Sequence, residues 1–509
     1  MINRSLLIKN VLTALTLSVV LSSCSNSGKG TSNITGWKYN DKNTTGFVVK
    51  DEVKRTTPVG MVPVEGGTFT IGEKTEVVTM QRNNLSRRIT VPSFYIDQYE
   101  ISNVNWREYT HWMQLVFGEA APDLVKRAMP DKTVWREELA YNDPLIQYYF
   151  DDPNYNYYPV VGVSWEQAVD FCQWRTDRVN EEALIRGGYI KAPDFKSLEG
   201  TDLQEITESF IFNTDKYLNS DAYQPLEGRK KLKDLYGNNV KVSMGEGILV
   251  PSIRLPTEAE WEFAAYGIKV SNKDKKQGFV QETREYPWSG SQIRSNKKGK
   301  YRGMMIANYV RGRGDMMGTS GALDDRGTYT VAVDSYFPND FGLYNMAGNV
   351  SEWVADVYRA TSFDDISEYS GFRGNVYTSF VTDGEDENGN PLFVIDSLGR
   401  IQTTVIKNGD KRNVKDGDPM SRVMTDFLLE GDTTGLSSLQ ARNVKIDPTD
   451  VLAPQIDDQT RVYKGGSWKD RIYWLSSGSR RFLNEKKCTN DIGFRCAMSM
   501  IGEAEKPVK

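Results

Sequence analysis

The order of apolar and polar positions predicts short strands and a few helices in this chain of 509 residues. Phe69 and Ile71 alternate with polar residues after a glycine pair, a spacing typical of a strand. Apolar residues recur over 89–96, where Pro92 predicts a break because proline cannot donate a sheet hydrogen bond. Residues 106–117 form a helical run. The pattern therefore predicts elements of both kinds, all of them short.

Two further helix starts are marked by capping residues. Ser164 is followed three positions later by Gln167, and the helix that follows would place Trp165, Val169 and Cys172 on one face. Thr257 is followed by Glu260 in the same way. The acidic residues at the second start are explained by capping and by the positive end of the helix dipole, without acid–base chemistry.

The first 57 residues predict a targeting signal followed by a flexible tether. A positive start and the apolar run 11–21 indicate a signal peptide over 1–23, because the run is too short to span a bilayer. Small residues ending on Cys24 resemble a bacterial lipobox, in which this cysteine is lipidated. The alternative is an ordinary signal peptide with an incidental cysteine. Residues 24–57 are polar and predict a flexible tether, although 36–37 and 46–49 could dock onto the body.

The position after the lipidated cysteine bears on the destination. Ser25 stands where lipoproteins kept at the inner membrane carry Asp, so the resemblance implies the outer membrane, with acyl chains on Cys24 holding the protein to lipid. No other long apolar run occurs in the sequence.

Charge and histidine content exclude several function classes. The formal net charge is −5 without a long basic block, which argues against nucleic acid as a partner. His111 is the only histidine, so a metal site with two or three histidines cannot form within one chain. His111 lies in the predicted helix 106–117 and is interpreted as a helix-face residue.

Three cysteines remain once Cys24 is assigned to lipid: Cys172, Cys488 and Cys496. An oxidising envelope permits a disulfide, and an odd number allows at most one pair and leaves one thiol. Spacing alone does not choose the pair.

The stretch 337–353 combines turn residues, aromatics and oxygen-bearing side chains. Gly348 and Asn349 predict a tight turn, because both residue types tolerate a left-handed backbone. Asn345 and Glu352 bear side-chain oxygens of the kind that calcium prefers. Two interpretations stay open from these residues alone, a calcium loop and a tight buried loop without metal.

Eight motifs in order resemble the formylglycine-generating enzyme, or sulfatase-modifying factor, family. They are GGTFTIG, FYIDQYEISN, PVVGVSW with FCQW, RLPTEAEWEFAA, YPWSG, FPNDFGLYNMAGNVSEW, KGGSW and GFRC. The resemblance covers 58–500 and implies an α+β fold, a variant of the C-type lectin-like fold with little regular structure. It leaves 501–509 as a tail.

Two insertions depart from the family pattern, at about 175–250 and 359–461. Within the second, 381–391 resembles half of a calcium-binding EF-hand loop, but Gly384 and Ile395 occupy two ligand positions. A hairpin turn is the better interpretation of that stretch.

The resemblance also bears on chemistry. Active members bind copper through two cysteines shortly after the GGS motif, where this chain has Asp470 and Leu475. A site without thiolates is a poor match for copper, and a single histidine cannot supply the iron site of related sulfoxide synthases. The resemblance therefore implies no copper and no enzyme activity. It also implies a disulfide between Cys172 and Cys496, with Cys488 free.

Two structural calcium sites are implied in the same way. The first would use the side chains of Asn345 and Glu352 with the carbonyls of Gly348 and Val350. The second would use the side chains of Asn308 and Asp325 with the carbonyls of Tyr309 and Gly327. The loop between the members of the second set is built differently here.

A closer resemblance within the family is to lipoproteins of the type IX secretion and gliding motility machinery. It rests on the lipobox, on residues 35–38, and on the segments VWREELAYND and VNEEALIRGGYIKA. The implied role is structural, on the periplasmic face of the outer membrane, with secretion and gliding proteins as partners. An active thiol oxidase and a surface lipoprotein that binds glycans or proteins are the alternatives. The tyrosines within 148–158 form an aromatic cluster that lies either at a protein interface or in the core.

Overall fold

The computed structural model describes residues 30–53, 55, 57–73, 84–221, 223–267, 284–296, 298–310, 329–359, 368–369, 371–374, 378–385, 389–405 and 459–502. The predicted signal peptide with Cys24, most of the second insertion and most of the predicted tail lie outside these residues. The chain divides into two compact units. The smaller comprises Met1–Arg55, Ala183–Lys191 and Leu226–Leu249, and the larger comprises the remainder. No helix in the described part is long and apolar enough to cross a bilayer.

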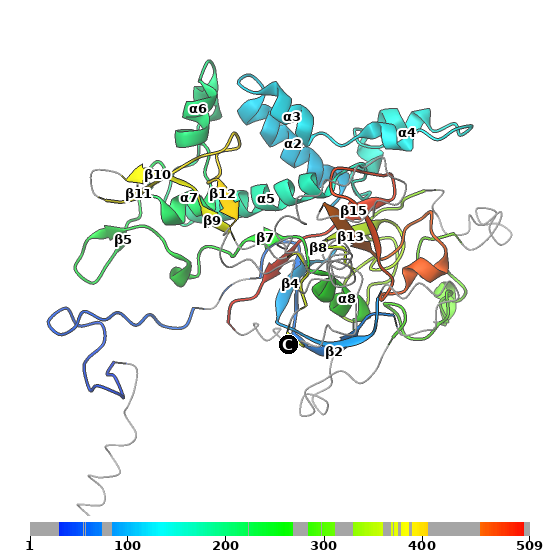
Figure 1. The fold of residues 1–509 in the computed structure, drawn as a ribbon, viewed down its shortest axis with the longest axis horizontal. Coiled ribbons are helices and arrows are strands. Elements are labelled where there is room, and N and C mark those ends of the chain that lie inside the picture. The colour runs from blue at the N-terminus through cyan, green and yellow to red at the C-terminus, as the bar shows by residue number, and fades with distance from the viewer. Residues whose placement is uncertain are drawn as a thin grey trace, which may run out of the picture. The chain divides into compact units, whose positions relative to one another are not determined.

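Two four-stranded sheets form the centre of the larger unit (Figure 1). The first has the order β1-β4-β16-β7, with every neighbouring pair antiparallel. Its strands are β1 (Met61–Val64), β4 (Phe94–Asp97), β16 (Ala497–Ser499) and β7 (Ile253–Arg254). The second has the order β14-β13-β8-β15, and its strands are β14 (Arg481–Asn484), β13 (Thr460–Lys464), β8 (Ser351–Val357) and β15 (Ile492–Phe494).

The register of the second sheet brings three of the sequence motifs together. β8 pairs with β13 in antiparallel fashion, so that Lys464 lies opposite Glu352. β8 also pairs with β15 in parallel, which places Gly493 opposite the same residue. Arg495 follows directly after β15 and therefore comes within reach of Glu352.

The strands expected near the start of the body are present. β2 (Gly67–Ile71) and β3 (Arg87–Val91) pair in antiparallel fashion, with Phe69 opposite Ile89. β3 ends before Pro92 and β4 begins after it, as the proline predicts. The residues Phe69, Ile71, Ile89, Val91, Phe94 and Ile96 of these strands form one buried core with Trp261 of α8 (Glu258–Tyr266).

The α-helices of the described residues are α2 (Asn103–Phe117), α3 (Pro122–Ala128), α4 (Asp143–Tyr148), α5 (Trp165–Arg186), α6 (Leu203–Glu205), α7 (Thr214–Asn219) and α8 (Glu258–Tyr266). α2 begins at Asn103 rather than Trp106, because the Ser102 backbone N–H donates to Asn105 Oδ1 at 3.2 Å and caps the helix earlier. His111 lies exposed on α2.

Both predicted capping boxes are confirmed. Ser164 N–H donates to Gln167 Oε1 at 2.9 Å at the start of α5, and Gln167 N–H donates to Ser164 Oγ at 3.2 Å. Thr257 and Glu260 make the equivalent pair of bonds at the start of α8, at 2.9 and 3.2 Å. α5 then packs against α2 through Trp106 and Phe171, whose rings stack at 5.3 Å and 9°.

The described parts of the second insertion form two exposed hairpin-like ribbons. β10 (Thr382–Glu385) pairs with β11 (Pro391–Phe393), which confirms the predicted hairpin. β9 (Thr378–Phe380) pairs with β12 (Thr403–Val405). All residues of β9, β10 and β12 are exposed, so these ribbons add little to the core.

The smaller unit contains the hairpin of β5 (Leu232–Lys233) and β6 (Asn239–Val240) from the first insertion. The segment expected to be a tether contacts the end of that insertion. Lys50 forms an ion pair with Glu246, and Arg55 donates to the carbonyls of Leu249 and Met244 at 2.9 and 2.7 Å. The apolar side chains of 36–37 and 46–49 that were expected to dock are largely exposed, with Trp37 at 54% and Phe47 at 60%.

The tyrosine-rich segment 148–158 divides between core and surface. Tyr149 and Phe150 are buried, and Tyr149 packs against Trp135 at 4.8 Å between ring centres. Tyr148 and Tyr157 are exposed. Some residues of the segment therefore belong to the core and others to the surface, so neither an interface alone nor a core alone describes it.

Candidate functional site

The loop after β13 holds the two positions at which active relatives are expected to carry copper-binding cysteines. Asp470 accepts hydrogen bonds from the Ser467 backbone N–H and Oγ at 2.8 and 2.7 Å. Its two oxygens also receive both terminal nitrogens of Arg481, at 2.7 and 2.6 Å. This paired arrangement is the strong geometry for an arginine–carboxylate contact. The guanidinium therefore already supplies the positive charge beside Asp470.

The second position is apolar. Leu475 is fully buried in a cluster with Tyr286, Met305 and Tyr309 and offers no donor atom. A soft metal such as copper(I) prefers thiolate ligands, and neither residue supplies one. The residues present at these two positions therefore do not fit copper.

An aromatic group borders the same loop. The Trp468 ring stacks on Trp135 at 6.2 Å and 20°, and Tyr329 meets Trp468 edge-on at 5.1 Å. Tyr329 in turn donates from its hydroxyl to Asn142 Oδ1 at 2.7 Å. Trp468 and Trp135 are both more than nine-tenths buried, so they stabilise the loop as core residues.

The first predicted calcium loop is a tight turn, as the sequence predicts. Asn345, Gly348 and Asn349 all have a left-handed backbone, with φ of 51°, 81° and 65°. A side chain at Gly348 would lie 2.4 Å from the Asn308 carbonyl oxygen, so only glycine fits there. The turn presents Asn345, Gly348 and Val350 within one short segment.

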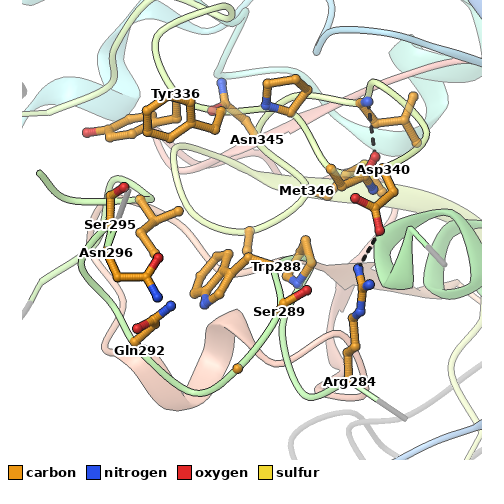
Figure 2. Close-up of a pocket in the computed structure, with 18 residues that line it drawn as sticks. Arg284, Trp288, Ser289, Gln292, Ser295, Asn296, Tyr336, Asp340, Asn345 and Met346 are labelled. Carbon is orange, nitrogen blue, oxygen red and sulfur yellow. Dashed lines mark hydrogen bonds and ion pairs between the residues drawn. The ribbon is translucent and has the colours of Figure 1, made fainter. Parts of the chain in front are cut away.

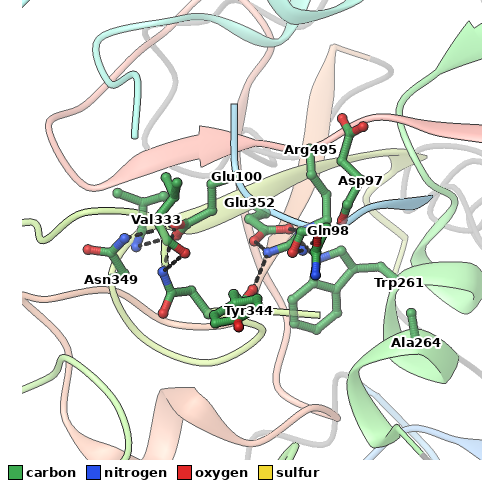
Figure 3. A network of polar contacts seen from close by, with 12 residues as sticks. Asp97, Gln98, Glu100, Trp261, Ala264, Val333, Tyr344, Asn349, Glu352 and Arg495 are labelled. Carbon is green, nitrogen blue, oxygen red and sulfur yellow. Dashed lines mark hydrogen bonds and ion pairs between the residues drawn. The ribbon is translucent and has the colours of Figure 1, made fainter. Parts of the chain in front are cut away.

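The fourth predicted ligand, Glu352, is held by other partners. Its oxygens receive Arg495 Nε and Nη2, both at 2.6 Å, and Trp261 Nε1 at 2.7 Å (Figure 3). All three side chains are fully buried. Because a cation already pairs with both carboxylate oxygens, Glu352 is poorly placed to bind a second one.

The carboxylate that faces the turn is Glu100, which the sequence analysis did not single out. Its oxygens accept from Asn345 Nδ2 at 3.0 Å, Asn349 Nδ2 at 2.8 Å and the Val350 backbone N–H at 3.3 Å. Among the described residues, no cation lies within ion-pair distance of it. Burial, with the nearby Glu352 charge as a second cause, raises the Glu100 pKa from 4.5 to about 8.

The groups that face the Glu100 oxygens are all N–H donors, from Asn345, Asn349 and Val350. A calcium ion there would need oxygen atoms in place of these N–H groups. In the described residues, no group of three or more His, Cys, Asp or Glu side chains could hold a metal. The signal that could have identified Glu100 is an acidic residue set between Tyr99 and Ile101, directly before the cap of α2.

The second predicted calcium set can be followed only in part. Asp325 and Gly327 lie outside the described residues. Asn308 is buried and donates from Nδ2 to the Tyr329 carbonyl at 2.7 Å. Tyr309 is buried nearby in the cluster around Leu475.

The cysteines expected to pair are neighbours. Cys172 of α5 and Cys496 after β15 are both fully buried, and their sulfur atoms lie 3.3 Å apart as two thiols. Burial raises the Cys496 pKa well above its ordinary value, and the contact with Cys172 adds to the effect. Cys488 lies apart from this pair, half-buried near Asp131. The structure thus brings the expected pair together, and the bond itself stays a prediction.

Comparison with known proteins places these features in one family. The model of the FGE-sulfatase family, described as the sulfatase-modifying factor enzyme 1-like domain, matches residues 47–500. The formylglycine-generating enzyme of Mus musculus is 23% identical over 296 residues, which is 58% of each chain. This chain thus spans less than two thirds of the length of that relative.

Shorter matches have higher identity. The formylglycine-generating enzyme of Thermomonospora curvata is 39% identical over 107 residues, 21% of this chain and 28% of the relative. A protein of Bos taurus named inactive C-alpha-formylglycine-generating enzyme 2 is 34% identical over 113 residues, 22% of this chain and 29% of its own.

Solved structures with similar folds include Treponema denticola variable protein 1 and PvdO from Pseudomonas aeruginosa. Each is 16% identical with a TM-score of 0.36 over 86% of this chain, and the matches cover 95% and 94% of those chains. The family match over 47–500, together with the mixed α and β elements described above, shows that the chain belongs to the FGE-sulfatase family and has its α+β fold.

Proposed function

We propose that this protein is a non-catalytic lipoprotein of the outer membrane, where it serves as a structural component or stabiliser of the type IX secretion and gliding motility machinery. Within its family the sequence resembles the gliding-motility lipoprotein GldJ and its sister, the type IX secretion lipoprotein GldK/PorK. The family also contains members named as inactive, so loss of catalysis has precedent among relatives.

One observation carries the non-catalytic part of the proposal. The two positions expected to bind copper hold Asp470, which is paired with Arg481, and Leu475, which is fully buried. An aspartate already neutralised by a bidentate arginine and a buried aliphatic side chain provide no thiolate to activate oxygen. The polar groups of the loop stabilise one another.

Copper binding and oxygen consumption test this part. The purified protein should neither bind copper(I) nor consume oxygen in the presence of a cysteine-containing peptide, whereas a formylglycine-generating enzyme assayed in parallel should do both. The variant with Asp470→Cys and Leu475→Cys provides an internal control, because copper binding by it would show that the loop still has the family geometry. Turnover of a peptide thiol by the unmodified protein would refute the proposal.

A structural calcium ion forms the second part. Glu100 would hold it beside the Glu352–Arg495 pair, with the carbonyls of Gly348 and Val350 as further ligands. The Asn345 side chain would turn so that its oxygen replaces the Nδ2 that faces Glu100. The ion would neutralise a buried carboxylate and stabilise the turn that links the two halves of the polar network. It would take no part in chemistry.

The structural role rests on the lipid anchor and the insertions. Acyl chains on Cys24 would hold the body at the periplasmic face of the outer membrane. The insertion ribbons expose their side chains and add little to the core, which suits contact with partner proteins. Affinity purification from cross-linked envelopes should recover secretion and gliding proteins.

Two outcomes would count against this role. Failure to recover any component of the machinery from gently solubilised membranes would contradict it. Removal of the body by protease treatment of intact cells would instead support a surface lipoprotein that binds glycans or proteins. A deletion strain that still secretes and glides normally would also contradict the structural role.

A further inference from the structure

A cavity of about 450 Å³ lies in the larger unit between the segments 284–296 and 336–347. Figure 2 shows Trp288 and Ser289 on one side of it and Tyr336 and Asn345 on the other. Its volume falls within the range of small-molecule sites, about 300–1,000 Å³. Neither Asp470 nor Leu475 lines it, although Ala347 and Trp288 of its lining pack in the same cluster as Leu475.

An aromatic platform forms one wall. The Trp288 ring stacks on Tyr286 with 5.0 Å between ring centres and an angle of 8°. Tyr286 is itself buried in the cluster around Leu475, so the indole is held in a fixed orientation. Such a ring offers a flat apolar face together with one polar atom at low cost in conformational entropy.

The indole N–H has no acceptor. Trp288 Nε1 is buried without a hydrogen-bond partner among the described residues. Figure 2 shows it on the side of the cavity where Gln292 and Asn296 lie. Other indole nitrogens, those of Trp112 and Trp174, are buried without a partner in the same way, so this donor does not by itself mark a binding site.

The cavity has no net charge. Arg284 and Asp340 are the only charged residues among the described ones that line it, and they pair at 2.9 Å. Figure 2 shows this pair at the end opposite Gln292 and Asn296. A phosphate or carboxylate ligand would have to compete with Asp340 for the guanidinium, and a cationic ligand would have to compete with Arg284. The cavity therefore favours a neutral ligand.

The uncharged polar groups are amides and hydroxyls. Gln292 and Asn296 each carry one carbonyl acceptor and an NH₂ donor in a fixed plane. Ser289 adds a hydroxyl on the same wall as Trp288. Groups that both donate and accept match vicinal hydroxyls, which also do both.

We propose that this cavity binds a neutral pyranose sugar, a hexose or an N-acetylhexosamine, either free or as a unit of a glycan. The C–H face of the ring packs on Trp288, and adjacent hydroxyls bind Gln292 and Asn296. The Arg284–Asp340 pair closes the other end of the cavity, and because its charges neutralise each other it does not repel a neutral sugar. The site requires neither the lipid anchor nor contact with secretion proteins, so it stands apart from the structural role.

Ligand-observed NMR with the purified protein tests the site. Glucose, galactose, mannose and N-acetylglucosamine serve as probes, and glucuronate and an aromatic amino-acid amide serve as contrasts. At least one neutral sugar should show saturation transfer and a millimolar or tighter affinity by titration. Trp288→Ala and Gln292→Ala should weaken binding tenfold or more, whereas Trp37→Ala, an exposed tryptophan in the smaller unit, should leave it unchanged.

Asp340→Asn gives an independent test, because Asp340 is half-exposed and its loss should not disturb folding. The freed guanidinium should turn the preference from the neutral sugar toward glucuronate by fivefold or more. No binding of any neutral sugar at 10 mM would overturn the proposal. Binding unaffected by Gln292→Ala and Asp340→Asn would overturn it equally, even where Trp288→Ala fails to fold. Capture of the amino-acid amide in place of a sugar would assign the cavity to a peptide instead.

Discussion

Glu352 and Glu100 lie in the same buried network but have different partners. Glu352 pairs with Arg495 and Trp261, whereas Glu100 accepts only from neutral N–H groups. Burying a charge without a counter-ion is costly, so the Glu100 pKa rises, whereas an ion pair offsets much of that cost for Glu352. The Glu100 carboxyl is therefore mostly protonated at neutral pH unless a cation binds beside it.

Calcium should therefore stabilise the protein through Glu100. Adding millimolar calcium after chelation should raise the unfolding temperature, because a ligand at about 100 times its Kd stabilises by about 2.7 kcal/mol. Glu100→Gln and Asn345→Ala should reduce the shift strongly, and Glu166→Gln on the exposed face of α5 should leave it intact. Equal unfolding temperatures in chelator and in calcium would show that no such site forms.

Asp356 should give a pH dependence of the opposite sense to most carboxylates. Burial and the neighbouring Glu258 charge raise its pKa from 3.8 to about 7. The folded protein then binds more protons than the unfolded chain between these two values, so this residue makes stability fall as the pH rises from about 4 to about 7. Above pH 7 its full cost is present.

Replacing Asp356 by Asn should remove that contribution. The free energy of unfolding of the variant, measured by urea denaturation from pH 4.5 to 7.5, should fall less with rising pH than that of the unmodified protein. Asp383→Asn in the exposed strand β10 provides the control and should leave the slope unchanged. Glu100 continues to titrate in both proteins with the same sign, so the slope is reduced rather than abolished.

At the scale of elements, the sequence predicted the caps, strands and turns that depend on interactions between residues close together in the chain. The capping boxes at Ser164 and Thr257, the strand over Phe69 and Ile71 and the hairpin around Gly384 each depend on neighbours in the chain, and each is present. The turn at Gly348 and Asn349 was visible for the same reason.

Contacts between distant segments were not visible. Glu100 meets Val350 across 250 positions, and Arg495 meets Glu352 across 143. The periodicity of the sequence does not predict such contacts. The contact between Arg495 and Glu352, for example, follows from the register of β8 and β15. The family resemblance assigned one side-chain ligand of the proposed calcium site to Glu352, a carboxylate that the structure pairs with Arg495.

The N-terminal cap of α8 should contribute measurably to the free energy of unfolding. Thr257→Ala removes the hydroxyl that accepts from the Glu260 N–H at 3.2 Å and should lower the free energy of unfolding by about 1 kcal/mol. Thr257→Ser keeps the hydroxyl and should restore most of the loss in the same denaturation experiment. A loss equal in both variants would point to the methyl group rather than the cap.

The exposed β5–β6 hairpin should matter for partners and little for stability. Tyr236 at its turn is 63% exposed, so Tyr236→Ser should change the free energy of unfolding by less than about 0.5 kcal/mol. The same variant should reduce recovery of partner proteins from cross-linked envelopes. Tyr157→Ser, equally exposed but outside both insertions, should not. If Tyr157→Ser reduced recovery of partner proteins and Tyr236→Ser did not, the partner contact would be assigned to the segment 148–158 instead.

At the scale of the whole molecule, anchoring and folding should be separable. The cores described above are built from residues beyond position 60, and no described helix could itself cross a bilayer. Under the proposed function, attachment to lipid depends on the acyl chains of Cys24, because several chains hold far better than a single one. Cys24→Ser, expressed with its natural leader, should therefore lose incorporation of labelled palmitate and leave the membrane fraction. The unfolding temperature of the released protein should match that of the same body prepared without residues 1–29.

Cys488→Ser should keep both the palmitate label and the membrane location, because that thiol lies in the body near Asp131. Retention of the Cys24→Ser protein on membranes washed with high salt would mean that the body binds lipid or an integral partner directly, and the anchor would then be secondary to that contact.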